Sequence, residues 1–130
     1  MKSITINQLV QQYSAEDHLV VAEREVRHIL QCAKIIRLEA EGSYTVIYFT
    51  DRKPIICSKY LRLIAERLNP KSFCRTHKSH VINLQAMKSY EEGRGGYVIM
   101  NDGTKITVSV RRKAAFMETL HTYAATLARS

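Results

Sequence analysis

The sequence predicts a mostly β domain, a sandwich of small antiparallel sheets with a short helix in the middle and a second helix at the C-terminus. Short runs rich in Val, Ile and Tyr follow one another from residue 18 to residue 108, and polar or glycine-containing breaks separate them. Only two segments carry apolar residues at helical spacing. Two helices are too few for the repeated strand-helix-strand units of a parallel sheet, so about eight antiparallel strands are expected.

The composition predicts one globular domain that needs no metal or disulfide to fold. The chain has 130 residues, of which 45% are hydrophobic and 25% charged. It has no apolar run long enough to span a membrane and no secretory leader at its start, which predicts a cytoplasmic protein. Its three cysteines lack the paired spacing of a zinc site and are expected to be reduced. Residues 1–17 are expected to form an arm or short helix ahead of the main domain at 18–130.

The first half of the domain consists of strands joined by short turns. The alternation within residues 43–50 places the odd-numbered positions on one face of a strand and the even-numbered positions on the other. Both faces are apolar enough that both are expected to be largely covered. The turn at 51–53 predicts a hairpin to a return strand. The expected strands cover 18–23, 26–30, 33–41, 43–50 and 54–58.

The second half adds two helices to a further set of strands. Ser58 is expected to cap a short helix, and Asn69 with Pro70 to end it. A strand-loop-strand unit follows over 73–83, and further strands follow within 86–92, 97–101 and 105–110. A helix after Ser109 is expected to pack inward along an apolar stripe of Phe116, Leu120, Tyr123, Ala124 and Leu127.

The positive charge is concentrated in one part of the chain. The net charge is +8, and residues 51–88 hold nine Lys or Arg against two acids, whereas residues 1–50 sum to −1. Arg111, Arg112 and Lys113 form a second cluster at the expected start of the last helix, where free N–H groups attract phosphate. This pattern indicates a polyanion as the partner. A solvated surface, an acidic protein and an acidic lipid remain open alternatives.

The run from Phe73 to Asn83, FCRTHKSHVIN, resembles the F-x-R-x-H-x-S-x-x-V/I-N signature of the LytTR family of bacterial DNA-binding domains. The expected order of strands and helices around this run also fits the family, over roughly residues 19 to 125. The resemblance implies an elongated sandwich of about ten strands in small stacked sheets. It also implies that inter-strand loops contact the major groove of duplex DNA to regulate transcription. A domain of this kind is not an enzyme and requires neither cofactor nor metal.

The resemblance implies three contact loops, which match residues 42–45, 75–79 and 109–113. Lys78 stands where relatives carry shorter polar residues, so the preferred base sequence cannot be transferred to this chain. The candidate DNA-contacting residues are Ser43, Tyr44, Thr45, Arg75, His77, Lys78, Ser79, Arg111, Arg112 and Lys113.

Several of these residues have a structural alternative to DNA contact. Arg111 carries a planar fork that can read guanine or bind phosphate, and the neighbouring Arg112 and Lys113 point about 100° apart along a helix and suit phosphates. Arg75 is expected either on phosphate or paired with an acid such as Glu39, and His77 either on phosphate or bracing its loop. Tyr44, on a strand edge, would more often pack in the core or at its rim, although its hydroxyl could reach phosphate. Asn83 is expected to hold its turn by bonding local backbone.

The sequence therefore predicts sequence-specific binding of double-stranded DNA in bacterial transcription regulation. The expected target is a set of repeated promoter half-sites, bound by paired copies or a homodimer. Relatives carry a receiver or sensor domain as partner, as response regulators of two-component systems do. The alternative is a basic protein- or lipid-interaction module without sequence-specific DNA binding. The first reading requires Ser43, Lys78 and Arg111 to lie on one face of the molecule.

Overall fold

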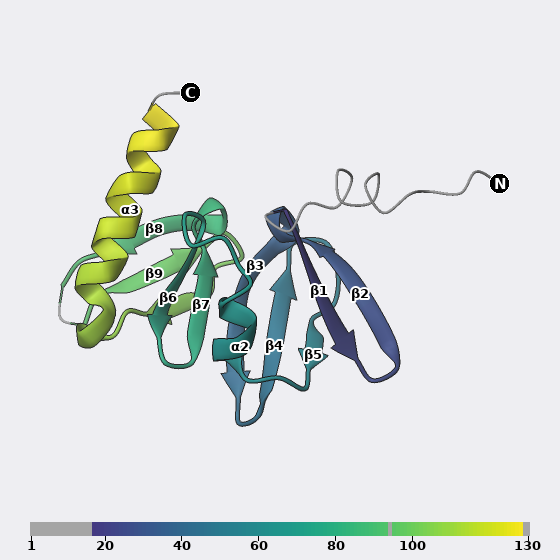
Figure 1. Ribbon diagram of the computed structural model, residues 1–130. Coiled ribbons are helices and arrows are strands. Elements are labelled where there is room, and N and C mark those ends of the chain that lie inside the picture. The colour runs from purple at the N-terminus through teal and green to yellow at the C-terminus, as the bar shows by residue number, and fades with distance from the viewer. Residues whose placement is uncertain (1–16, 94, 129–130) are drawn as a thin grey trace.

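We describe residues 17–93 and 95–128 from a computed structural model of the chain. The arm or short helix expected over 1–17 lies, apart from Asp17, outside these residues. The described part is built from ten strands, three single-turn 3-10 helices and two α-helices (Figure 1). The strands are β1 (His18–Glu23), β2 (Val26–Gln31), β3 (Ile35–Glu41), β4 (Tyr44–Phe49), β5 (Ile55–Cys57), β6 (Phe73–His77), β7 (His80–Asn83), β8 (Met87–Glu91), β9 (Tyr97–Met100) and β10 (Lys105–Thr107). The helices are η1 (Cys32–Lys34), α2 (Leu61–Ala65), η2 (Leu84–Ala86), η3 (Val110–Arg112) and α3 (Lys113–Ala128).

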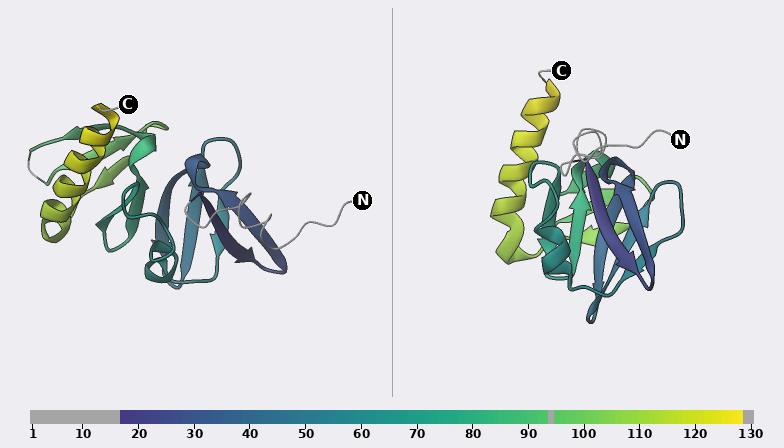
Figure 2. Two further views of the ribbon diagram at one scale, coloured as in Figure 1. Left: turned by 45° about the horizontal axis from the view of Figure 1, so that its top comes forward. Right: turned by 45° about the vertical axis from the view of Figure 1, so that its right-hand side comes forward.

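The strands form three antiparallel sheets arranged in a row. The central sheet has five strands in the order β5-β4-β3-β7-β6. The hairpin β1-β2 lies at one end of the row, and the three-stranded sheet β10-β9-β8 lies with α3 at the other (Figure 1 and the left view of Figure 2). This arrangement confirms the mostly β, elongated sandwich with a middle helix and a terminal helix. Each of the ten strands in the described residues overlaps one of the segments expected from the sequence, although the total had been put at about eight.

The central sheet contributes to two separate hydrophobic cores because several of its strands are buried on both faces. On β3, Ile35 packs in the core shared with β1, β2 and α2, whereas its neighbour Ile36 packs in the core shared with β8–β10 and α3. On β7, the neighbours Val81 and Ile82 divide between the same two cores. Successive side chains of a strand point to opposite faces. One strand can therefore hold both halves of the molecule together.

The expectation that β4 is covered on both faces is wrong. Its odd-numbered positions, Thr45, Ile47 and Phe49, are buried, but its other face is half-exposed. Tyr44, the first residue of that other face, keeps 49% of its surface exposed. The cause is that the β1-β2 hairpin and α2 pack in the core on the odd-numbered side only. An apolar composition on both faces did not reveal which face had a partner.

Both α-helices differ at their ends from what the sequence predicts. The N-cap of α2 is Tyr60, not Ser58, and its side chain makes no capping hydrogen bond. In α3 the inward stripe ends early, because Phe116 is fully buried and Leu120 and Tyr123 pack against the core, whereas Ala124 and Leu127 are exposed. The last turns of α3 extend beyond the β8–β10 sheet that its first turns cover (Figure 1). Neither helix has the length and hydrophobicity of a membrane-spanning segment.

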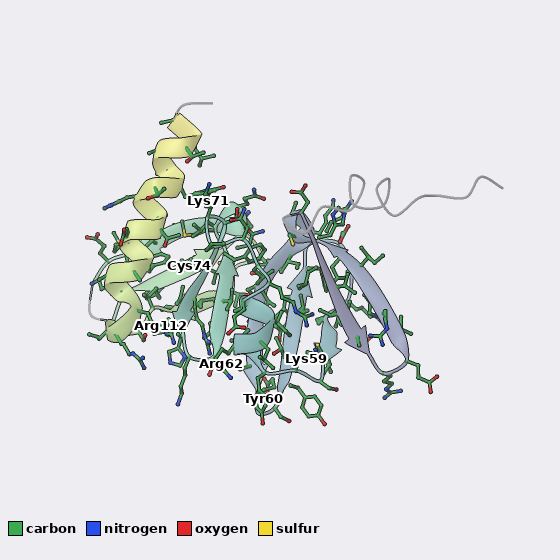
Figure 3. The ribbon with its side chains drawn as sticks, in the orientation of Figure 1. Lys59, Tyr60, Arg62, Lys71, Cys74 and Arg112 are labelled. Carbon is green, nitrogen blue, oxygen red and sulfur yellow. The ribbon has the colours of Figure 1, made fainter. Side chains whose placement is uncertain are left out.

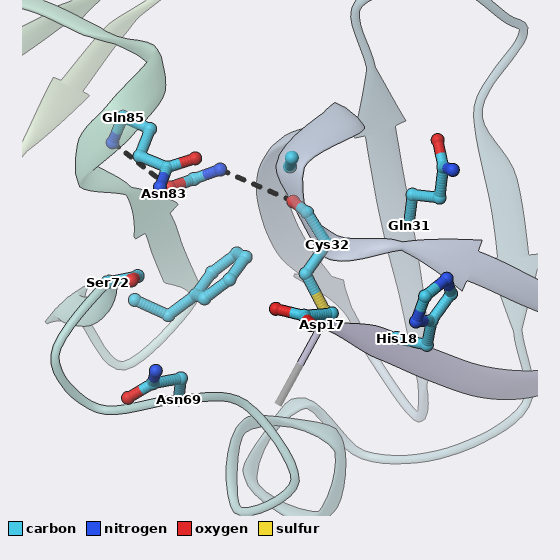
Figure 4. A pocket seen from close by; sticks show the side chains of 10 residues that line it. Asp17, His18, Gln31, Cys32, Asn69, Ser72, Asn83 and Gln85 are labelled. Atoms are coloured by element: carbon cyan, nitrogen blue, oxygen red, sulfur yellow. Dashed lines mark hydrogen bonds between the residues drawn. The ribbon is translucent and has the colours of Figure 1, made fainter. Parts of the chain in front are cut away.

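The side chain of Asn83 joins two segments that are distant in the sequence. Its amide nitrogen donates to the backbone oxygens of Cys32, at 3.4 Å, and Ile35, at 2.8 Å. Its amide oxygen accepts a hydrogen bond from the backbone N–H of Gln85 at 3.0 Å (Figure 4). The predicted role in holding the local turn is confirmed by this last bond. The bonds across to η1 and β3 were not predicted, because they depend on the pairing of β3 with β7.

Replacing Asn83 with Ala should lower the free energy of unfolding by about 2 to 3 kcal/mol, because it leaves buried backbone groups without partners. Asn83 is itself only 1% exposed, so water cannot substitute for the lost amide. Urea denaturation would measure the change. The control is Gln85→Ala, because the Gln85 side chain is exposed. This substitution should alter the free energy of unfolding by no more than about 0.5 kcal/mol. Equal effects of the two substitutions would contradict this role of Asn83.

Candidate nucleic-acid interface

The three predicted contact loops meet along one edge of the molecule. The β3-β4 turn, the β6-β7 turn and the start of the η3-α3 segment all lie at the lower edge in Figure 1. Two backbone hydrogen bonds connect them. Ala40 of the first hairpin donates to Ser79 of the second loop at 2.9 Å, and Ser109 of the third loop donates to Thr76 of β6 at 2.8 Å. The edge defined by these three loops is called the loop edge below.

The first loop is a two-residue turn that exposes Ser43. The last residue pair of β3 and β4 is Glu41 with Tyr44, so only Gly42 and Ser43 reverse the chain. Gly42 has a φ of 61°, a left-handed conformation that favours glycine in so short a turn. Ser43 is exposed and Tyr44 is half-exposed. Both side chains are accessible to a partner at the loop edge.

Thr45 is removed from the predicted contact residues. Its side chain is fully buried, and its hydroxyl donates to the backbone oxygen of Lys59 at 2.7 Å. It lies on the same face of β4 as the buried Ile47 and Phe49. A residue in this position cannot reach DNA. It ties the first hairpin to the segment that precedes α2.

The second loop is also a two-residue turn, and its flanking side chains hold its backbone in place. His77 pairs with His80, which leaves Lys78 and Ser79 at the tip. The Arg75 guanidinium donates to the backbone oxygen of Lys78, and the backbone N–H of Ser79 donates to His77 Nδ1 at 3.1 Å. His77 therefore braces the loop, which was one of its two predicted roles. Lys78 is exposed, whereas Ser79 is half-buried.

Glu39 is not the partner of Arg75, contrary to one of the two alternatives predicted for that arginine. The Glu39 carboxylate instead lies 3.2 Å from the Arg37 guanidinium and 3.5 Å from His80 Nδ1. Arg37 is only 8% exposed, and its guanidinium stacks 3.8 Å above the centre of the Tyr48 ring. Glu39, which lies within β3, is thus occupied behind the loop edge. It does not neutralise the cations at the tips.

The third loop carries its arginines in a 3-10 turn that precedes the α-helix. Arg111 lies in η3, and α3 begins at Lys113. The backbone N–H of Arg112 donates to Ser109 O at 3.0 Å, which fixes the turn. Arg111 and Lys113 are exposed, whereas Arg112 is half-buried. The two exposed side chains extend from a rigid start of the helix, and Arg112 lies closer to the protein surface.

Three arginines from separate elements lie close together at the loop edge. Burial lowers the pKa of Arg75, and the like charges of Arg112 and then Arg62 lower it further. Among residues 17–93 and 95–128 the ion pairs are His28–Glu23, Lys34–Asp51, Arg37–Glu39 and His80–Glu39. None of them involves a cation of the three loops or Arg62. Positive charges without acidic partners favour an anion as the ligand of this edge.

Four residues that were not among the predicted contacts lie at or beside the loop edge. Lys59, Tyr60 and Arg62 lie along the lower edge with Arg112 (Figure 3), and all three are exposed. Val110 is 88% exposed next to Arg111. The signal for Val110 was an apolar residue at the start of a basic run. Lys59 and Arg62 belong to the basic stretch 51–88, but their position at the edge depends on the pairing of Thr45 with Cys57.

The described residues of the loop edge are not arranged as a metal-binding site. The rings of His77 and His80 are 5.6 Å apart, centre to centre. Within the described ranges, no group of three or more His, Cys, Asp or Glu side chains is arranged to hold a metal ion. The cysteines Cys32, Cys57 and Cys74 are buried and free, as predicted. The chemistry available at the loop edge is that of cations, hydroxyl groups and backbone turns.

Comparison with known proteins agrees with this geometry. Residues 25–121 match the sequence model of the family described as the LytTr DNA-binding domain. The chain is 28% identical over 89 residues to the CO-responsive transcriptional regulator RcoM of Rhodospirillum rubrum. The aligned region covers 68% of this chain and 37% of RcoM, so the chain spans little more than a third of that protein's length. The fold matches the LytTr DNA-binding domain of a Bacillus cereus protein described as a methyl-accepting/DNA response regulator. That match has a TM-score of 0.70, 19% identity, and covers 81% of this chain and 97% of the other.

His80, behind the second loop, should titrate below its ordinary pKa of 6.5. Burial lowers the pKa of His80 most, His77 and Arg37 lower it further, and Glu39 opposes them. The unfolded chain therefore binds this proton more readily than the folded chain. The stability due to His80 is fully present above about pH 6.5 and decreases as the pH falls toward the folded pKa.

NMR titration of the His80 ring measures this shift directly. The midpoint should lie below the ordinary value in the folded protein and return to it in denaturant. Glu39→Gln should lower the midpoint further, since it removes the one charge that favours the imidazolium. A midpoint that is unchanged by unfolding would contradict the assignment.

Proposed function

Because this chain belongs to the LytTR family of DNA-binding domains, we propose that it binds double-stranded DNA sequence-specifically through the three loops of the loop edge and thereby regulates bacterial transcription. The observation that carries the proposal is the pair of backbone hydrogen bonds, Ala40 to Ser79 and Ser109 to Thr76, that joins the three loops. Exposed Ser43, Lys78 and Arg111 thus belong to one continuous edge. The loops are inferred to insert into the major groove, where base edges can be distinguished.

The exposed side chains divide into two kinds of contact. Lys78 and Arg111 are proposed to read base edges, because each extends from a backbone that is fixed by hydrogen bonds. A bidentate Arg-guanine pair provides about 1 to 3 kcal/mol of discrimination. Arg112 and Lys113 are proposed to bind DNA phosphates. Ser43, Tyr44 and Ser79 are proposed to do the same where they reach the sugar-phosphate backbone of the DNA. Arg75 and His77 are proposed to act by holding the second loop, since both form hydrogen bonds to its backbone.

The wider biological context is also proposed. We assign the DNA-binding domain to residues 18–130 and expect it to act on repeated promoter half-sites, as paired copies or a homodimer on DNA. A receiver or sensor domain is the proposed source of the signal, and the cytoplasm the proposed location. The CO-responsive relative, of which the chain spans 37%, supports a separate sensory part. We propose no enzymatic activity, because the family is one of DNA-binding domains. The family match also makes DNA a better-supported partner than an acidic protein or lipid.

Binding to duplex DNA should weaken steeply with salt. If about five to eight phosphates are neutralised, the logarithm of the association constant should fall with the logarithm of the salt concentration at a slope of about −5 to −7. Fluorescence anisotropy with a labelled duplex, repeated at several salt concentrations, would measure the slope. The duplex should come from selection of bound sequences in a random pool. A slope near zero, or a pool from which nothing is enriched, would rule out the proposed function.

Arg111→Ala and Lys113→Ala should weaken binding in different ways. Arg111→Ala should relax the preference at one base position by about 1 to 3 kcal/mol, whereas Lys113→Ala should weaken all sequences alike and reduce the salt slope by about one. Both residues are exposed, so neither change should unfold the protein. Affinities for the selected duplex and for its single-base variants separate the two effects. Identical losses on every duplex would show that Arg111 does not read a base.

A further inference from the structure

The segment 58–62, which comprises the connection after β5 and the first two residues of α2, emerges beside the first contact loop. Thr45 of β4 pairs with Cys57 of β5, and the Thr45 hydroxyl donates to the backbone oxygen of Lys59 at 2.7 Å. Ser58 also lines a surface hollow together with Tyr44. The strand pairing and the hydrogen bond therefore hold the backbone of this segment against the first hairpin at the loop edge.

The side chains of this segment are exposed and carry unpaired positive charge. Lys59 and Arg62 are exposed, and Tyr60 keeps 60% of its surface accessible. Neither Lys59 nor Arg62 belongs to an ion pair among the described residues. Arg62 is close enough to the second loop to lower the pKa of Arg75. The segment thus continues the charge of the loops instead of forming a separate patch.

We infer that Lys59 and Arg62 form a fourth contact element, which binds DNA phosphates alongside the three loops. This inference rests on the proposed function. In Figure 3 the labelled residues follow the lower edge from Arg112 through Arg62 and Tyr60 to Lys59. A duplex that lies along the loop edge would therefore present its backbone to this segment. The Tyr60 hydroxyl is a further donor within the same stretch.

The chemistry of the segment fits phosphate better than bases. Unlike Lys78, Lys59 does not stand at the tip of a two-residue turn, and its compact charge on a long flexible stem suits a point contact with phosphate. Arg62 lies beside two other arginines, and a phosphate placed among them would relieve their mutual repulsion. The element should therefore add affinity for every duplex and no preference for one sequence.

Matched substitutions test this role. Lys59→Ala and Arg62→Ala should each reduce the salt slope by about one and weaken specific and random duplexes by the same factor. Lys71→Ala is the control, because Lys71 is also exposed but lies near the opposite, upper edge in Figure 3. It should leave both the slope and the affinity nearly unchanged. The Thr45–Lys59 hydrogen bond uses the backbone oxygen of Lys59, so Lys59→Ala should leave the fold intact.

A second measurement uses the unaltered protein and does not depend on how the variants fold. Acetylation of lysines would be followed by mass spectrometry with and without duplex DNA. With nine-tenths of the protein bound, acetylation of Lys59 should slow by about tenfold, because only the free tenth reacts. Acetylation of Lys71 should not change. Random and selected duplexes should protect Lys59 equally when the protein is equally saturated.

The outcomes separate this inference from the proposed function. If the unaltered protein does not bind duplex DNA in a salt-dependent way, the proposed function fails. If it binds with the expected slope, but Lys59 and Lys71 behave alike on substitution and on acetylation, the fourth contact element is overturned and the three loops remain. Protection of Lys59 together with reduced slopes for Lys59→Ala and Arg62→Ala would establish it.

Discussion

The two-sided burial of the central sheet is the constraint on which the rest of the structure depends. Ile35 and Ile36 of β3 pack in different cores, as do Val81 and Ile82 of β7. Because side chains alternate along a strand, a shift of one residue in register would exchange the contents of the two cores. Such a shift would place polar and ill-fitting side chains inside. The register is therefore fixed, and it determines which residues stand at the turns.

A fixed register and short turns explain how separate parts of the chain present charge in one direction. Each of the first two loops has only two residues at its tip, so each tip has little freedom to move away from its strands. The backbone hydrogen bonds from Ala40 N–H to Ser79 O and from Ser109 N–H to Thr76 O align the tips with the third loop. Glu39 is held behind them by Arg37 and His80. The exposed cations are thus positioned without being neutralised.

The sequence predicted where the strands lie better than which of their residues are buried or exposed at the loop edge. Hydrophobic alternation located the strands, and the signature from Phe73 to Asn83 located the second loop. Alternation also placed Thr45 on the odd-numbered face of its strand, whereas the family resemblance placed it among the DNA contacts. The buried position shows that the strand pattern was the better guide. The site at Lys59 and Arg62 could not be predicted, because it arises from cross-strand pairing that leaves no local pattern.

Base reading and phosphate binding place different demands on a side chain. Reading a base requires a side chain held in a defined geometry, and the cost of ordering it is smaller when its backbone is already fixed. Lys78 and Arg111, the proposed base-reading residues, extend from such backbones. Phosphate contacts tolerate variation in geometry, so the long side chains of Lys59 and Lys113 are adequate for them even though their charged ends are not held. The cations of the loop edge that lack acidic partners can attract the duplex before the proposed base-reading residues test its sequence.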